Sequence, residues 1–168
     1  MKSIINAIFL SVFFLVFFTA CQEDEPIAEA EVVPEVRTFP FVDERLWDFF
    51  RRFEDEAAER GLAIDLNAEG ITGEIMEIEQ DRVAGSCSFG SHITNHVTID
   101  LGFWNSSNDL FREFVVFHEL GHCSLLLGHR EETLEDGTCA SIMRSGLEDC
   151  RDNYRFLTRE SYLDELFE

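Results

Sequence analysis

Two histidines and a glutamate lie close enough in the chain to belong to one functional site. They belong to the run His118-Glu119-Leu120-Gly121-His122. On an α-helix, residues four apart are separated by one turn and about 40° of rotation, so His118 and His122 face the same way. Two imidazoles placed in this way can bind one zinc ion, and Glu119 can reach a water on that ion. The pattern therefore predicts a zinc site with a general base beside it.

A catalytic zinc ion needs a third protein ligand and an open fourth position. His129 is the main candidate, but in an unbroken helix it would lie about 10 Å beyond His122, too far to share the ion. We therefore expect the helix to break after about Leu126, with Gly128 as the left-handed residue that turns the chain back. Acidic residues remain as alternative third ligands: Glu131, Glu132 and Asp136 nearby, or Glu160 from a later helix.

The same residues resemble the motif of the metzincin zinc peptidases. That motif continues past the second histidine to a glycine and a third histidine, and a methionine turn follows. The matching residues in this chain are His118, Glu119, His122, Gly128-His129 and Ser141-Ile142-Met143. The usual metzincin spacing would put the third ligand at Gly128, so His129 is one residue late. The run from His118 to Cys123 also resembles small exported bacterial relatives whose helix ends in His-Cys.

This resemblance implies a zinc-dependent endopeptidase with one catalytic Zn²⁺ ion. His118, His122 and His129 would be the metal ligands, Glu119 the catalytic base, and Met143 would pack beneath the ligands. Tyr154 is a candidate for stabilising the oxyanion, as tyrosines do in some relatives.

The run must lie on a helix, and the surrounding sequence predicts one from about Asp109 to Leu127. Apolar residues and then histidines recur at spacings of three and four, and several candidate N-caps precede them between Trp104 and Asp109. The residues of this stripe are Phe111, Phe114, Val115, His118 and His122.

The remaining sequence predicts an α+β fold. The first helix, at 43–60, carries one apolar stripe and stops at Gly61; the stripe is Leu46, Phe49, Phe50, Phe53 and Ala57. Strands are expected at 71–78, 83–89 and 96–101, with a turn at Gly90-Ser91-His92. They would form a small, mostly antiparallel or mixed sheet with the first helix packed on one face. Residues 128–152, which hold the methionine turn, are expected to be irregular, and 158–167 to form a short helix.

The first twenty residues have the layout of a secretory signal: Lys2, an apolar stretch and then small residues. Phe18-Thr19-Ala20-Cys21 resembles the lipobox of bacterial lipoproteins, in which the thiol of the cysteine is acylated. An ordinary signal peptide followed by a chance cysteine is the alternative.

Three segments follow from this interpretation. They are a signal peptide at 1–20, an acidic and disordered tether at 21–38, and a metallopeptidase-like domain at 39–168. Lipid on Cys21 would anchor the exported protein to the bacterial outer membrane. The acidic run after Cys21 resembles surface-export signals of some Gram-negative lipoproteins, so both a periplasmic and a cell-surface location stay open.

The net charge argues against one class of partner, and the cysteine count predicts disulfides. The formal net charge of −21 argues against nucleic acid, because little could neutralise phosphates. Four cysteines follow Cys21, and in an exported chain they predict two disulfides with three possible connectivities. The pairs Cys87–Cys123 and Cys139–Cys150 would tie the sheet to the active helix and close the loop around Met143. A four-cysteine zinc site is disfavoured, because no two of these cysteines are closely spaced.

We expect a monomer that cleaves extended peptides, with substrate pairing to an exposed edge at strand 96–101 or at its neighbour. Two alternatives remain: a non-catalytic, zinc-containing surface lipoprotein or binding module, and a zinc amidase that acts on cell-wall peptides. Glu119 speaks against the first, because a structural zinc site needs no general base. His92 and His96 are expected to be surface residues.

Overall fold

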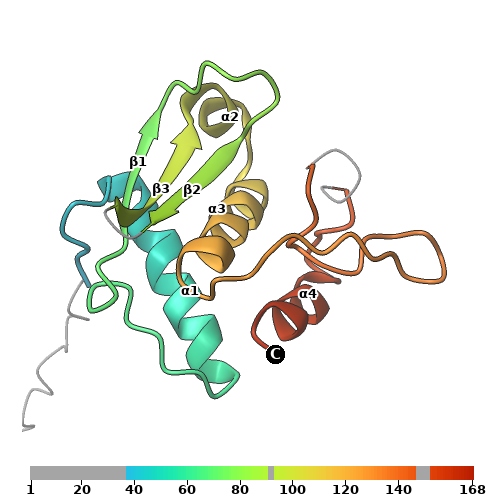
Figure 1. The fold of residues 1–168 in the computed structure, drawn as a ribbon. Coiled ribbons are helices and arrows are strands. Elements are labelled where there is room, and N and C mark those ends of the chain that lie inside the picture. The colour runs from blue at the N-terminus through green and yellow to red at the C-terminus, as the bar shows by residue number, and fades with distance from the viewer. Residues whose placement is uncertain (1–36, 91–92, 147–151) are drawn as a thin grey trace, which may run out of the picture. The chain divides into compact units, whose positions relative to one another are not determined.

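A three-stranded sheet and four α-helices make up the computed structural model shown in Figure 1, within the residues that it describes. These are residues 37–90, 93–146 and 152–168, without the side chains of Ile93 and Thr94. All of them belong to one unit, Glu35–Glu168. The predicted signal peptide, Cys21 and nearly all of the predicted tether lie outside the described residues. The predicted α+β class with a mixed sheet is confirmed.

The first helix forms where its apolar stripe predicts. A 3-10 turn, Glu44–Leu46, leads into α1, Trp47–Glu59, and the side chain of Asp43 caps the turn by accepting from the backbone N–H of Arg45. All five residues of the predicted stripe are buried. Gly61 follows the helix with φ 82°, a conformation that favours glycine, and so ends it as predicted.

The sheet contains β1 (Thr72–Met76), β2 (Gly85–Gly90) and β3 (Ile93–Asp100) in the order β1-β3-β2. The central strand β3 runs parallel to β1 and antiparallel to β2. The predicted strand 96–101 is therefore the middle of the sheet, it begins earlier than predicted, and it does not include Leu101.

A short helix that the sequence did not predict follows directly. Helix α2, Leu101–Ser106, begins where β3 ends, because the side chain of Asp100 accepts from the backbone N–H of Phe103 at 2.7 Å. This N-cap satisfies a helix donor at the strand end, so no linker is needed.

Helix α3, Asp109–Cys123, is the central element of the fold and carries the histidine run. Asn108 caps it by accepting from the backbone N–H of Phe111 at 2.9 Å. The helix packs against β2, β3 and α1, so it covers the sheet more directly than α1, which had been predicted in that place (Figure 1). It ends at Cys123, before the predicted Leu127.

The last helix, α4 (Arg159–Leu166), closes the core near its predicted position. The ring of Phe53 from α1 lies 5.2 Å from that of Phe117 on α3 and 4.9 Å from that of Phe167 after α4. These edge-to-face contacts join three helices through one side chain. Among the described helices, none has the length and apolar character needed to cross a membrane.

A disulfide joins Cys87 on β2 to Cys123 at the end of α3, as predicted. Cys139 is disulfide-bonded too. Its predicted partner, Cys150, lies outside the described residues.

Candidate metal centre

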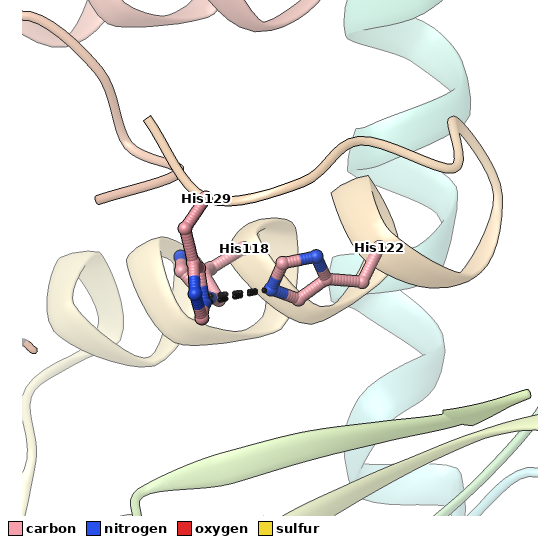
Figure 2. A group of neighbouring side chains, drawn as sticks. All are labelled: His118, His122 and His129. Carbon is pink, nitrogen blue, oxygen red and sulfur yellow. Dashed lines mark hydrogen bonds between the residues drawn. The ribbon is translucent and has the colours of Figure 1, made fainter. Parts of the chain in front are cut away.

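Three imidazoles meet beside the last turns of α3. Figure 2 shows His118 and His122 projecting from the helix and His129 reaching them from the segment that follows. One ring nitrogen from each lies within 4.8 Å of the other two. His118 is buried, His122 is half-buried and His129 is exposed, so the cluster opens toward solvent on one side. A metal ion could be held by these three ligands.

Two of the distances between the nitrogens fit tetrahedral coordination. The Nε2 atom of His122 lies 3.1 Å from Nε2 of His118 and 3.2 Å from Nε2 of His129. Two nitrogens bound to one tetrahedral zinc ion at about 2.05 Å are about 3.3 Å apart. The arrangement therefore needs little adjustment to take such an ion.

Hydrogen bonds fix the tautomers of the two helical histidines. The Nδ1 atom of His118 lies 2.8 Å from the carbonyl oxygen of Ile142, and Nδ1 of His122 lies 2.6 Å from that of Leu127. A carbonyl oxygen only accepts, so both Nδ1 atoms carry the proton and both Nε2 atoms carry a lone pair. Two lone pairs facing each other at 3.1 Å repel unless a cation lies between them, and this is the pattern expected of metal ligands.

The chain break needed to return His129 occurs, but at a different residue from the one predicted. Leu126 has φ 56°, whereas Gly128, the predicted left-handed residue, is absent from the positive-φ positions. The backbone N–H of Leu127 then donates to the carbonyl of Gly121 at 3.0 Å and folds the turn against the helix. The backbone turn therefore precedes the glycine, and Gly128 links it to His129.

The turn that contains Met143 contacts both α3 and the segment that carries His129. Met143 is fully buried, and a Cβ atom on Gly121 would come within 2.5 Å of its sulfur. Glycine at this helical position therefore lets Met143 pack against α3. The neighbouring Ile142 supplies the carbonyl that orients His118, and the backbone N–H of Arg130 donates to the carbonyl of Met143 at 2.9 Å. The turn thus holds both the helix and the returning segment.

Glu119 lies between α3 and β2 and is only 6% exposed. Burial raises its pKa to about 8, although a hydrogen bond from the backbone of Cys87 works in the other direction. A Cβ atom on Gly85 would lie 2.9 Å from both Cγ and Oε1 of Glu119, so this carboxylate fits only against a glycine. A cation held by the histidines would favour the ionised carboxylate and lower this pKa.

Burial raises the pKa of Glu119 but lowers the pKa of the two helical histidines. It lowers the pKa of His118 to about 4 and also lowers that of His122. Both rings are therefore neutral near pH 7, which is the form that binds metals.

A cleft of about 340 Å³ contains the site. Its walls are the segment leading into β2, β2 itself, α3 and the two segments that carry His129 and the methionine turn. The lining residues are Arg82, Val83, Ala84, Gly85, Ser86, Cys87, Val115, His118, Glu119, His122, His129, Arg144 and Gly146.

Several candidates from the sequence lie elsewhere. Tyr154 is buried and donates its hydroxyl to Glu113 at 2.7 Å, so it is absent from the cleft lining. Glu160 pairs with Arg60 and Arg159, away from the histidines.

The acidic candidates closer to His129 are occupied in the same way. Glu131 accepts from the backbone N–H of Ser145, and Asp136 caps a turn at Thr138. Among the described residues, only the three histidines form a cluster suited to a metal ion. His96 is partly exposed and contacts Thr72 and Glu74 on the sheet, and His92 lies outside the described residues.

Gly85, Arg82 and Arg144 are among the cleft residues that were not predicted from the sequence. A glycine inside a strand is a signal of close backbone approach, and that signal was present at Gly85. Nothing local could have shown that its neighbour is Glu119.

No known protein family, curated protein or solved structure matches this chain in the comparisons made. The resemblance to the metzincins therefore rests on the sequence motif and on the three-histidine cluster alone.

Proposed function

We propose that this protein is a zinc-dependent endopeptidase whose metal is held by His118, His122 and His129. The observation that carries the proposal is the convergence of three imidazole nitrogens beside a buried glutamate in one open cleft. Three nitrogen ligands with one open side are typical of catalytic zinc, whereas structural zinc sites are usually closed by four protein ligands.

Each residue has a role in peptide-bond hydrolysis. Zinc bound at the three histidines would polarise the scissile carbonyl and make water acidic enough to attack it at neutral pH. Glu119, held by the Cys87 backbone, accepts the proton of the attacking water and delivers it to the leaving amine. Ile142 and Leu127 keep two of the imidazoles in the metal-binding tautomer.

Strand β2 supplies a docking edge for an extended substrate. The central strand β3 has a partner on each side, which leaves it no free edge. In the described part of the chain β2 pairs with β3 alone, and Gly85, Ser86 and Cys87 of this strand line the cleft. An extended peptide hydrogen-bonded to β2 would pass the histidines, as peptides do when they add a strand to a sheet.

Comparison of the purified wild-type protein with Glu119→Gln tests this proposal. Both should bind one zinc ion per chain, because Glu119 is not a ligand. Cleavage of a denatured protein should fall by about 100-fold or more in the variant, because the proton acceptor is lost. Zinc content by atomic spectroscopy and cleavage by mass spectrometry measure the two effects.

Two outcomes would overturn the proposal. Stoichiometric zinc with no cleavage across a broad peptide library would favour a non-catalytic zinc protein. Undiminished cleavage by Glu119→Gln would remove Glu119 from the mechanism.

A further inference from the structure

The charge of the cleft is opposite to that of the chain. The sequence contains 34 acidic and 13 basic residues. The cleft lining nevertheless holds two arginines, Arg82 and Arg144, and a single carboxylate, Glu119. A random sample of this surface would be acidic, so the two cations require an explanation.

Arg144 is fixed beside the site by its neighbours. Its side chain is 21% exposed, its Nη1 donates to the backbone carbonyl of Glu131 at 3.1 Å, and its Nε lies 3.7 Å from the Glu131 carboxylate. Because Arg144 follows Met143 directly and Glu131 lies two residues after His129, these contacts hold the guanidinium on the wall that carries the third histidine. At 3.7 Å the ion pair is loose, and part of the guanidinium remains accessible.

Arg82 also lines the cleft; it belongs to the segment just before β2 and is exposed. No ion pair of Arg82 is found among the described residues. Most other described arginines pair with a carboxylate, namely Arg37, Arg45, Arg51, Arg52, Arg60, Arg130 and Arg159. In so acidic a chain, an exposed cation in the cleft lining that has no ion pair within the described residues is available to bind an anion.

The arginines do not serve to neutralise Glu119. Neither forms an ion pair with it in the described part of the chain, and its hydrogen bond comes from the backbone of Cys87. The lining of the cleft thus contains two guanidinium groups that can contact a bound substrate.

We infer that the cleft selects peptides that carry a carboxylate close to the scissile bond, and that Arg82 and Arg144 bind it. This inference rests on the proposed peptidase function and adds its substrate class. Guanidinium groups bind carboxylates through charge-assisted hydrogen bonds, and a partly enclosed cleft weakens competition from water. The carboxylate has two sources: an Asp or Glu side chain, or the free C-terminus of the peptide.

The test measures binding and cleavage separately. Zinc-loaded, full-length Glu119→Gln is titrated with matched peptides that carry Glu or Gln at each position around one bond, each with a free or an amidated C-terminus. Wild-type protein is then assayed for kcat/KM on the same set. We expect the Glu peptides to bind and react roughly tenfold better than the Gln peptides.

Variants assign the preference to residues. Arg82→Gln and Arg144→Gln, each made in both backgrounds, should reduce the Glu-to-Gln ratio toward one. Arg51→Gln removes the same charge from α1, outside the cleft, and should leave the ratio unchanged. Zinc content of each variant shows that the site remains folded.

Each result has one meaning. If amidation weakens binding and the Glu and Gln peptides bind equally, the carboxylate is the C-terminus; if Glu peptides bind better than Gln peptides even when both are amidated, it is a side chain. Equal binding of charged and neutral peptides to Glu119→Gln would overturn the inference, even if wild type cleaves both. A preference in binding without any cleavage would uphold the carboxylate site and refute the peptidase.

Discussion

His122 has one ring nitrogen bound to the Leu127 carbonyl and the other facing two imidazoles. The same turn of chain that orients His122 also returns His129, because Leu127 is two residues before it. His129, seven positions after His122, is therefore coupled to it through the hydrogen bond at Leu127, and the candidate ligands form one local unit.

Replacing His129 by alanine tests this unit. Loss of a direct ligand should weaken zinc binding by more than the roughly 10–100-fold that is typical of outer hydrogen-bond partners. Competition with a metal indicator measures the affinity, and His96→Ala, on the sheet, is the matched control. If His129→Ala binds zinc as wild type does, the third ligand is another residue.

Gly85 restricts the position of the Glu119 carboxylate, the proposed general base. In Gly85→Ala the new methyl group would lie 2.9 Å from Glu119, so the carboxylate must move. We expect kcat to fall by at least about tenfold while zinc affinity is kept, because misplacing a catalytic group is costly. Gly128→Ala, where the added Cβ meets nothing within 4 Å, is the control. Equal activity of both variants would show that the Glu119 carboxylate can shift without a loss of kcat.

At the level of elements, the site depends on the docking of α3 against β2. Three contacts join them: the Cys87–Cys123 disulfide, the hydrogen bond from Cys87 to Glu119, and the close approach of Gly85. One strand therefore positions Glu119, forms one wall of the cleft and covalently fixes the end of the helix that carries the histidines.

Removal of this disulfide by Cys87→Ser with Cys123→Ser should lower the free energy of unfolding by about 3–4 kcal/mol, because its loop spans 36 residues of sequence. Urea denaturation measures the loss. Activity at low temperature should persist in part, since packing of α3 on the sheet remains. A stability equal to that of the wild type would mean that packing alone fixes this junction.

Across the whole molecule, a buried ionic cluster connects the helices on the side away from the cleft lining. Glu113 of α3 is 1% exposed, and its carboxylate accepts from Arg52 of α1 at 2.7 Å and from Arg159 of α4 at 2.6 Å. The hydroxyl of Tyr154 donates to the same carboxylate. This cluster accounts for Tyr154 being distant from the chemistry that the sequence suggested for it.

Glu113→Gln should destabilise the protein by about 3 kcal/mol, because the two arginines lose a buried counter-charge. Thermal unfolding should show a lower midpoint, whereas zinc stoichiometry in the folded protein should not change. Glu160→Gln removes an exposed partner of Arg159 and should change stability by less than about 0.5 kcal/mol. Similar effects of the two substitutions would show that burial of Glu113 adds nothing.

Much of this protein could be predicted from short stretches of sequence. The period of the apolar residues in 43–60 specifies which face of α1 is buried, and the facing of His118 and His122 follows from helix geometry alone. The stripe predicted on the second helix was incomplete, because α3 is buried on all sides from Glu113 to Gly121. The need for an early helix break also followed from the 1.5 Å rise per residue. These features depend only on residues a few positions apart.

Only the tertiary structure decided the rest. The order β1-β3-β2 makes β2 the strand at the cleft, and it depends on contacts among residues far apart in sequence. The same holds for Gly85 against Glu119 and for the presence of both Arg82 and Arg144 in the lining of one cleft. The turn formed at Leu126 instead of Gly128, because hydrogen bonds and packing of the whole segment outweighed the local preference of one glycine. Sequence periodicity thus predicted that His118 and His122 share one helix face, whereas long-range packing determined the cleft around them.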